Sequence, residues 1–388
     1  MGRDTPLQGI VVLDMSQGIA GPSCGGHFAE HGAEVIKIEP PEGDWIRNLG
    51  AKIDGNSSPA LLYNRGKQSL AVDLKSPRGR DLALKLAERA HVVIESARPG
   101  VMERLGVGFD AIKARQPDIV YISVSGWGQR GPMRGEPMVD TVAQAVSGLM
   151  SVMRSREGNP GKMDAAAIDA ITGLYAFQAA AMALWNKKKG SGARHLDISL
   201  LQSAAHIQGP NVIEAAHSGK QPTILNPPAG NYRTADGWMA VTLVTEAHFQ
   251  GICRAIGQPK LYENPRFATF AARRDCIPEL RAILDEALAR HTTEHWVKAF
   301  AREGALASRI NNYLDWHAHP QVKAIDAAPL YQLSTGDSVR IPHLPGEPPN
   351  ALPVPAIGGH SRAVLAKLGL APSDIDALIA DGVVRQAG

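Results

Sequence analysis

Cysteine is scarce in this sequence, and its distribution excludes several classes of protein. The three cysteines, Cys24, Cys253 and Cys276, are odd in number and far apart, so we expect neither a disulfide framework nor a metal centre. A charge excess is also missing. The net charge is +3 and the cations are dispersed, which argues against nucleic-acid binding. The N-terminus lacks the charged-then-apolar pattern of a secretion signal, so we expect a protein of the reducing cytoplasm.

Long apolar runs without polar residues are absent as well. The longest apolar stretch, 165–185, is mostly alanine and carries Asp169 and Gln178, so we do not expect it to cross a membrane. The chain has 388 residues, of which 44% are hydrophobic and 20% charged. This composition and length are typical of a soluble globular protein with about two domains.

Short apolar runs alternate with helical patterns through the first 205 residues. Five such runs stand out, at 9–14, 35–39, 70–74, 92–95 and 119–124. Their length and composition suit buried parallel strands. The repeated strand–helix–strand order predicts an α/β fold, with a doubly wound, Rossmann-like sheet in a large domain over residues 1–205.

The chain changes character after about residue 205. Residues 221–325 predict a small α+β domain, because a strand pattern is followed by amphipathic helices. We expect linkers at 206–220 and 326–356, the second ending in a proline-rich stretch. Residues 330–388 should return to the large domain or to a partner chain, and 361–384 predict two helices split by a Gly-Leu-Ala-Pro turn.

One aspartate stands inside an apolar helix candidate. Residues 163–186 are alanine-rich and nearly uncharged, which is typical of a buried helix. Asp164 stands at the predicted start and can cap the free N–H groups, but Asp169 lies further in. A carboxylate there is costly unless it is bonded, paired or beside a cavity. Asp169 is therefore either a helix-start residue at a solvent gap or a nucleophile in a desolvated site.

The first strand–helix loop suggests dinucleotide binding, but its spacing argues against it. Gly18, Gly21 and Gly25 give G-x-x-G-x-x-x-G, whereas the dinucleotide fingerprint is G-x-G-x-x-G. Pro22 also removes an N–H group from the helix start that would hold the pyrophosphate. The loop still suits a phosphate of another cofactor.

Several short motifs follow one another along nearly the whole chain. They are Leu13-Asp14 with Ala20-Gly21-Pro22, residues 32–47, 64–69 and 73–75, Arg98-Pro99-Gly100, Gly126-Trp127-Gly128, Asp169 with Gly173, and residues 358–365. Each is weak alone, but the ordered set resembles that of the class III (CaiB/BaiF family) CoA-transferases. The resemblance implies that family's fold, a Rossmann-like large domain with a small α+β domain.

The resemblance gives Asp169 a chemical role. In that family the matching aspartate, with a glycine four residues later, attacks an acyl-CoA thioester. This implies CoA transfer from an acyl-CoA donor to a free carboxylic acid, through an acyl–aspartyl anhydride and an aspartyl-CoA thioester on Asp169. CoA would be a substrate, with no permanently bound cofactor. Apolar surroundings would exclude water, and helix N–H groups would stabilise the oxyanion.

The resemblance also implies a set of CoA contacts. The matching positions are Ile19, Ala20, Val72, Asp73, Leu74, Lys75, Ser96, Ala97, Arg98, Arg104 and Asp140. The chain departs from the formyl-CoA transferases in three places. Ser96-Ala97 replaces Asn-Phe, Ile19 replaces Gln, and the stretch 227–230 has one glycine where a glycine-rich active-site loop is expected. These departures argue against formyl or oxalyl transfer and favour a larger or more apolar acid.

Two other functions stay open. The same fold hosts α-methylacyl-CoA racemases, whose histidine base follows a strand end. Residues 126–130 contain no histidine, so a racemase or isomerase of 2-methylacyl-CoA esters is the second hypothesis. A non-catalytic CoA-binding protein is the third, and Asp169 argues against it. The family also forms interlocked homodimers, which the long connections around 205–222 and 325–356 would allow.

Overall fold

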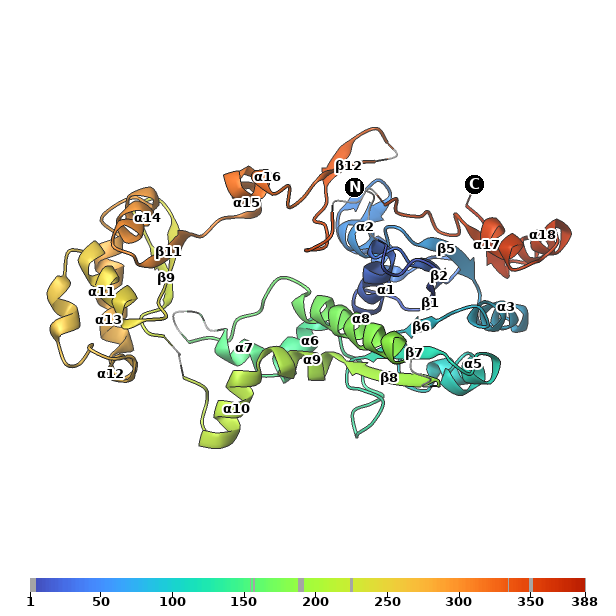
Figure 1. The fold of residues 1–388 in the computed structure, drawn as a ribbon, viewed down its shortest axis with the longest axis horizontal. Coiled ribbons are helices and arrows are strands. Elements are labelled where there is room, and N and C mark those ends of the chain that lie inside the picture. Colours follow the sequence, from blue (N-terminus) through green and yellow to red (C-terminus); the bar gives the residue numbers. More distant parts are fainter. Residues whose placement is uncertain are drawn as a thin grey trace. The chain divides into compact units, whose positions relative to one another are not determined.

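The chain folds into two compact units in a computed structural model (Figure 1). The first unit comprises residues 1–212 and 327–388, and the second comprises 213–326. The structure describes residues 5–153, 155, 158–187, 192–223, 226–333, 335–348 and 352–387.

A seven-stranded sheet forms the centre of the first unit. Its order is β14-β5-β2-β1-β6-β7-β8, and every pair is parallel except β14 with β5. The strands are β1 Val11–Asp14, β2 Glu34–Glu39, β5 Gln68–Val72, β6 Val92–Glu95, β7 Val120–Ser125, β8 Arg194–Ser199 and β14 Val384–Arg385. The chain winds outward from β1 in one direction and then from β6 in the other. The predicted doubly wound sheet is therefore confirmed, and its strand order reverses between β1 and β6.

Helices cover both faces of this sheet, as Figure 1 shows. Alternate strand residues point to opposite faces. Val12 packs with one helical layer and Leu13 with the other. The first layer consists of α1 Ala20–Glu30, α6 Asp140–Val146, α8 Ala167–Lys187 and α9 Leu200–Ile207. The second consists of α3 Pro77–Ala87, α5 Phe109–Arg115, α17 Ser361–Lys367 and α18 Pro372–Ala380.

Shorter elements complete the first unit. They are η1 Trp45–Asn48, β3 Lys52–Ile53, β4 Asn56–Ser57, α2 Ser58–Tyr63, α4 Val101–Arg104, α7 Leu149–Val152, β12 Leu330–Gln332 and β13 Ser338–Arg340. Of these, η1 and α4 follow β2 and β6, so they lie near the point where the strand order reverses.

The apolar helix predicted at 163–186 is α8, but it begins at Ala167. Asp164 therefore does not cap it; that side chain is exposed and pairs with Lys162. By length and composition alone α8 could cross a membrane, and 33% of its apolar window is buried within this chain. One face of α8 packs along α1 and over β7 and β8, whereas Leu174, Met182 and Trp185 are exposed, so the expectation of a fully buried helix holds for that face only.

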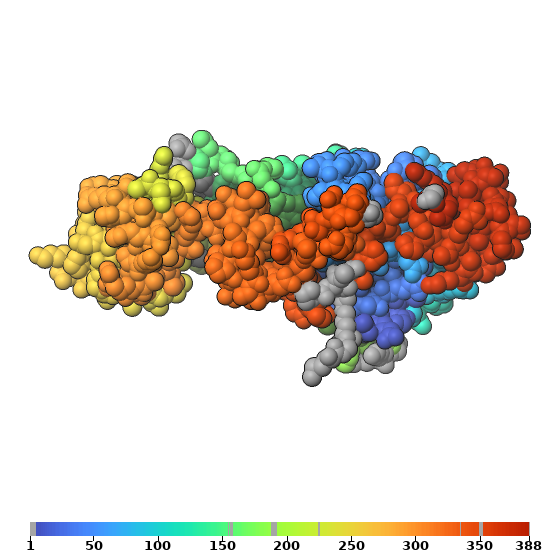
Figure 2. Space-filling view, turned by 90° about the horizontal axis from the view of Figure 1, so that it is seen from above, coloured from blue at the N-terminus to red at the C-terminus, as the bar shows by residue number. Residues whose placement is uncertain are grey.

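The C-terminal segment joins the first unit. The two predicted helices are confirmed as α17 and α18, but sequence patterns did not predict β14, which adds an antiparallel edge strand beside β5. Figure 2 shows the red C-terminal atoms packed beside blue N-terminal ones. Val384 pairs with Val72, so the last residues cover one edge of the sheet.

The second unit is a separate α+β body. Its antiparallel sheet has the order β11-β10-β9, with β9 Gly230–Arg233, β10 Trp238–Thr242 and β11 Leu306–Arg309. Its helices are α11 Glu246–Ala255, η2 Pro259–Glu263, α12 Phe270–Arg274, α13 Ile277–Leu288, α14 Thr293–Arg302, α15 Tyr313–Ala318 and α16 Pro320–Ala324. The two units divide between Val212 and Ile213, within the linker predicted at 206–220, and most of that segment is helical, with the end of α9 and all of α10 (Gly209–Ser218).

Candidate active site

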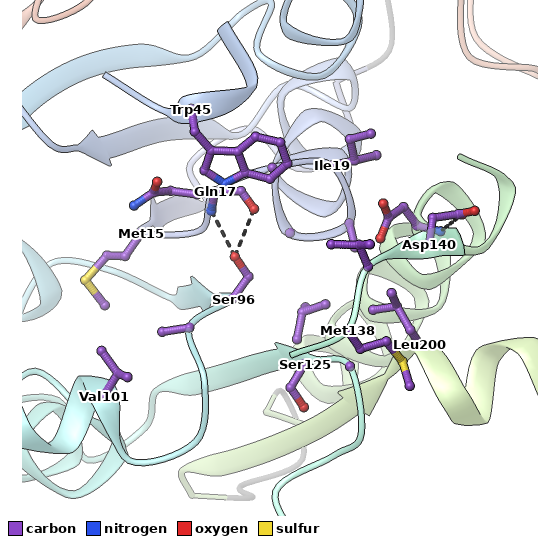
Figure 3. Close-up of a pocket in the computed structure, with 18 of the residues that line it drawn as sticks. Met15, Gln17, Ile19, Trp45, Ser96, Val101, Ser125, Met138, Asp140 and Leu200 are labelled. Carbon is purple, nitrogen blue, oxygen red and sulfur yellow. Dashed lines mark hydrogen bonds between the residues drawn. The ribbon is translucent and has the colours of Figure 1, made fainter. Parts of the chain in front are cut away.

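A cavity of about 660 Å³ opens at the carboxyl ends of β1 and β6, where the strand order reverses (Figure 3). Open α/β sheets bind their ligands at this place, because the loops diverge to either side. Its lining is Met15, Gln17, Gly18, Ile19, Ala20, Gly21, Trp45, Leu49, Leu74, Ser96, Ala97, Val101, Met102, Leu105, Val124, Ser125, Gly126, Met138, Val139, Asp140, Thr141, Ala166, Asp169 and Leu200.

Two loops that are distant in sequence are fastened together at the cavity. The Ser96 hydroxyl accepts a hydrogen bond from Gln17 N (2.9 Å) and donates one to Gln17 O (3.0 Å), as Figure 3 shows. Glu95, at the end of β6, accepts a hydrogen bond from Ala97 N (2.8 Å). Burial raises the pKa of Glu95 to about 7. The loops after β1 and β6 thus form one wall.

A buried ion pair holds the roof of the cavity. Asp44 accepts hydrogen bonds from Gly18 N and Ile46 N, both at 3.1 Å, and its other oxygen lies 2.9 Å from Lys37 Nζ. Both side chains are fully buried. Gly18 has φ +84°, and a Cβ there would lie 2.7 Å from the Trp45 ring. Only glycine allows the indole to lie against this loop.

Asp169 lies in the first turn of α8 and lines the cavity. Four residues later Gly173 is buried where α8 crosses α1. A Cβ at Gly173 would lie 2.7 Å from Ala20 O and 2.6 Å from Ser23 Cβ. The glycine therefore lets the two helices approach closely. Since Ala20 itself lines the cavity, this contact sets Asp169 beside the start of α1.

Asp140 caps the helix that carries Asp169. One carboxylate oxygen accepts hydrogen bonds from Ile168 N (2.7 Å) and Asp169 N (3.0 Å), and the other accepts from Gln144 Nε2 (2.5 Å). Gln144 is fully buried and also bonds both the N–H (3.0 Å) and the carbonyl (3.1 Å) of Met163. These bonds fix the segment that leads into α8. The cap was predicted at Asp164, but it comes from α6.

The electrostatics of this pair favour a reactive carboxylate. Burial and, second, the negative charge of Asp140 raise the pKa of Asp169 to about 7. Asp169 is thus partly ionised at neutral pH and more basic than an ordinary aspartate. The α8 N–H groups expected to stabilise an oxyanion are occupied, since two bond Asp140 and Ala170 N bonds Ala166 O at 3.0 Å. The start of α1 is different, because its N-cap residue Ile19 has no side-chain cap.

The structure brings together some of the predicted CoA contacts. Seven predicted site residues line the cavity, namely Ile19, Ala20, Leu74, Ser96, Ala97, Asp140 and Asp169. Arg98 lines an adjoining cavity of about 360 Å³ with Arg134 and Glu136. The described lining of neither cavity includes Val72, Asp73, Lys75 or Arg104. Val72 packs in the core beside β14, whereas Lys75 and Arg104 are exposed. Contact of these four with CoA stays a prediction.

Sequence reasoning missed several lining residues. Gln17, Trp45, Met138 and Leu200 come from four separate segments. Trp45 had a signal in the sequence, since it is an aromatic residue directly after the Gly-Asp of a motif. The others carried none, because single apolar residues near strand ends are common in any α/β domain.

The remaining predicted features are residues 126–130, the loop 227–230 and the expected lack of a metal site, and of these residues Gly126 lines the cavity. Residues 126–130 hold no histidine, and Gln129 N donates to Asp197. The expected active-site loop 227–230 belongs to the second unit, where the buried Arg273 donates from Nε to Pro227 O at 3.1 Å. Among the described residues, no cluster of His, Cys, Asp and Glu suits a metal ion.

The fold is a Rossmann-like α/β sheet, and the cavity where its strand order reverses is lined by two carboxylates, Asp140 and Asp169. Residues 7–361 match CoA-transferase family III, and the chain belongs to this family. It is similar to the human succinyl-CoA:glutarate CoA-transferase, with 31% identity over 400 residues, 100% of this chain and 91% of the relative. It is also similar to a probable fatty acyl-CoA transferase of Mycobacterium tuberculosis, with 32% identity over 321 residues. This match covers 78% of this chain and 82% of the relative.

Solved structures agree with this assignment. A CAIB/BAIF family protein from Brucella suis superposes with a TM-score of 0.81 at 27% identity, covering 94% of this chain and 100% of that chain. The predicted family, the fold class and the general activity of a CoA-transferase are therefore confirmed.

Proposed function

We propose that the protein transfers CoA from an acyl-CoA donor to a free carboxylic acid through covalent intermediates on Asp169. The observation that carries this proposal is the position of Asp169, which lines the cavity beside a second carboxylate, that of Asp140. Its raised pKa makes the ionised form a better nucleophile than an ordinary aspartate.

Each step forms one acyl bond and breaks one. An Asp169 oxygen attacks the thioester carbonyl, the C–S bond breaks, and an acyl–aspartyl anhydride and CoA thiolate result. The thiolate attacks the aspartyl carbonyl, which releases the donor acid and leaves an aspartyl-CoA thioester. The acceptor carboxylate then attacks that thioester, giving a new anhydride and thiolate. The thiolate finally attacks the acceptor's carbonyl, so the new acyl-CoA leaves and the Asp169 carboxylate is restored.

The cavity supports this chemistry in two ways. Its walls are largely apolar, which keeps water from hydrolysing the anhydride. The start of α1 lies at the cavity, and no hydrogen-bond acceptor is found for Ala20 N or Gly21 N among the described residues. We infer that these groups, and not those of α8, stabilise the developing oxyanion.

The test is an exchange reaction with a matched control. The protein is incubated with succinyl-CoA or acetyl-CoA and a panel of free acids, and new CoA esters are detected by mass spectrometry. Asp169→Ala should abolish transfer, and hydroxylamine with acyl-CoA should leave an adduct on Asp169 in the unsubstituted protein. Asp164→Ala, an exposed aspartate in the same segment, should be fully active.

A different outcome would favour the racemase. Deuterium exchange at the α-carbon of a 2-methylacyl-CoA in heavy water, without any acceptor acid, would replace the transferase proposal. Substantial transfer by Asp169→Ala would exclude Asp169 as the nucleophile, because alanine has no carboxylate that could form the anhydride.

The proposal includes a cytoplasmic, interlocked homodimer. The first part rests on the scarce, scattered cysteines and the second on the family resemblance. Leu174, Met182 and Trp185 leave apolar surface exposed along α8, which supports a partner on that face. Light scattering of the purified protein tests for the dimer, and a monomer at micromolar concentration would refute it.

A further inference from the structure

The main cavity, which Asp169 lines, has an uneven distribution of charge. Among the described residues that line it, none is positively charged, and the two charged side chains are Asp140 and Asp169. Around them lie Ile19, Met138 and Leu200, which Figure 3 shows near Asp140. The part of the cavity around Asp140 and Asp169 is therefore acidic and apolar.

The nearby buried cations are already paired. Lys37 lies behind the roof, where it contacts Asp44 (2.9 Å) and donates to Ser16 O (2.8 Å). Lys67 contacts Asp14 (2.7 Å) and donates to Pro22 O (2.8 Å) and to an Asn64 oxygen. Both lysine side chains are fully buried, so neither can neutralise a ligand in the cavity.

Positive charge is found instead at the adjoining cavity. Two cations, Arg98 and Arg134, and one carboxylate, Glu136, line it, so its charged side chains carry a net positive charge. It shares Ser96, Met138 and Val139 with the main cavity. The phosphates of a CoA ester suit this cationic side. The acyl group would then point the other way, toward the acidic end.

We propose that the acids exchanged at this site are apolar monocarboxylic acids, whose only charge is the reacting carboxylate. This inference rests on the proposed function. A dicarboxylic acid would place its second carboxylate near Asp140 without a cation to offset either burial or repulsion. The human relative is named for glutarate and succinate, both dicarboxylic, so the two proteins would differ in substrate class.

Pairs of acids with the same number of carbon atoms test the proposal. Butyrate is compared with succinate, and valerate with glutarate, as acceptors and as donor CoA esters. We expect kcat/KM to favour the monocarboxylic member by about 100-fold or more, the usual scale for a buried charge without a partner. Equal use, or preference for the dicarboxylic member, would overturn the proposal.

A charge-adding variant sharpens the test. Val139 is 57% exposed and lines both cavities next to Asp140. Val139→Arg should improve use of succinate relative to butyrate by about 10-fold, whereas the uncharged control Val139→Met should not. An unchanged ratio in Val139→Arg would show that charge in the cavity does not set the preference.

A binding experiment separates this proposal from the transfer reaction itself. Asp169→Ala is titrated calorimetrically with butyryl-CoA and with succinyl-CoA. Tighter binding of butyryl-CoA by about 10-fold or more is expected even if the variant is inactive. If binding shows this preference but no acid accepts CoA in the unsubstituted protein, the proposed function fails and the acyl preference stands. Equal binding would refute the preference.

Discussion

Replacing Asp140 tests whether its charge tunes the proposed nucleophile. Asp140 is 8% exposed, and its carboxylate caps α8 at Ile168 N and Asp169 N. Asp140→Asn keeps an oxygen for these N–H groups but removes the negative charge. The pKa of Asp169, now about 7, should fall, because a like charge nearby has been removed.

The size of the change follows from the order of the two causes. Burial is the larger cause of the raised pKa and the charge of Asp140 is the smaller, so most of the elevation should persist. We expect the acid limb of the pH–rate profile to move down by about one pH unit. The variant should lose about 1 kcal/mol of stability, since its amide N–H₂ would face Gln144 Nε2 and that hydrogen bond is lost.

The assay is kcat for one donor and one acceptor between pH 5 and 9. Asp140→Ala provides a contrast, because it removes both the charge and the cap and should cost about 2 kcal/mol of unfolding free energy. Asp164→Asn is the matched control and should leave the profile unmoved. A folded Asp140→Asn enzyme with an unshifted acid limb would refute the electrostatic role of Asp140.

Further predictions concern packing, stability and cofactor contact. Gly173→Ala should destabilise the protein by about 2 kcal/mol or more in urea unfolding, although alanine favours helices, because its Cβ would meet Ala20 O. The control Gly209→Ala should leave the stability unchanged, because a Cβ at Gly209 would have no atom within 4 Å. Asp169→Asn should raise the unfolding free energy by about 1–3 kcal/mol at pH 8. The Asp169 carboxyl holds its proton more tightly in the folded state. Its contribution to the free energy of unfolding is therefore fully present at low pH and is lost as pH rises through about 7. The gain should vanish near pH 4. Arg98→Ala should raise KM about 10-fold or more for every acyl-CoA donor, and Arg104→Ala should do the same if it meets a phosphate. An increase confined to one acyl group would place either side chain at the acyl end instead.

The candidate nucleophile could be found from the sequence, but the start of its helix could not. Asp169 stood out because a carboxylate in an apolar helix needs a partner or a cavity. The same reasoning chose Asp164 as the cap, since that residue type suits a helix start. The bonds from Ile168 N and Asp169 N go to Asp140 on another helix, and no local pattern predicts such a contact.

The predicted CoA contacts show the same limit. Ile19, Ala20, Ser96 and Ala97 line the cavity because they follow β1 and β6, and the strand pattern already placed those loops at the switch point. Arg104 also follows β6 but lies outside the described lining of the cavity. Which loop residue faces a cavity depends on how the loop folds back, and the periodicity of its strand does not encode that.

The sequence alone determined the doubly wound order of β1, β2, β5, β6 and β7, because each of these strands coincides with a short apolar run, whereas β8 and β14 do not. It also determined the family, because motifs keep their order along the chain. Only the tertiary structure decided the charge around Asp169. Burial and the Asp140 carboxylate act through space, and both come from segments that meet only when the chain is folded. Hydrogen bonds such as that from Gln17 N to Ser96, 79 positions apart, join residues with no pattern in common.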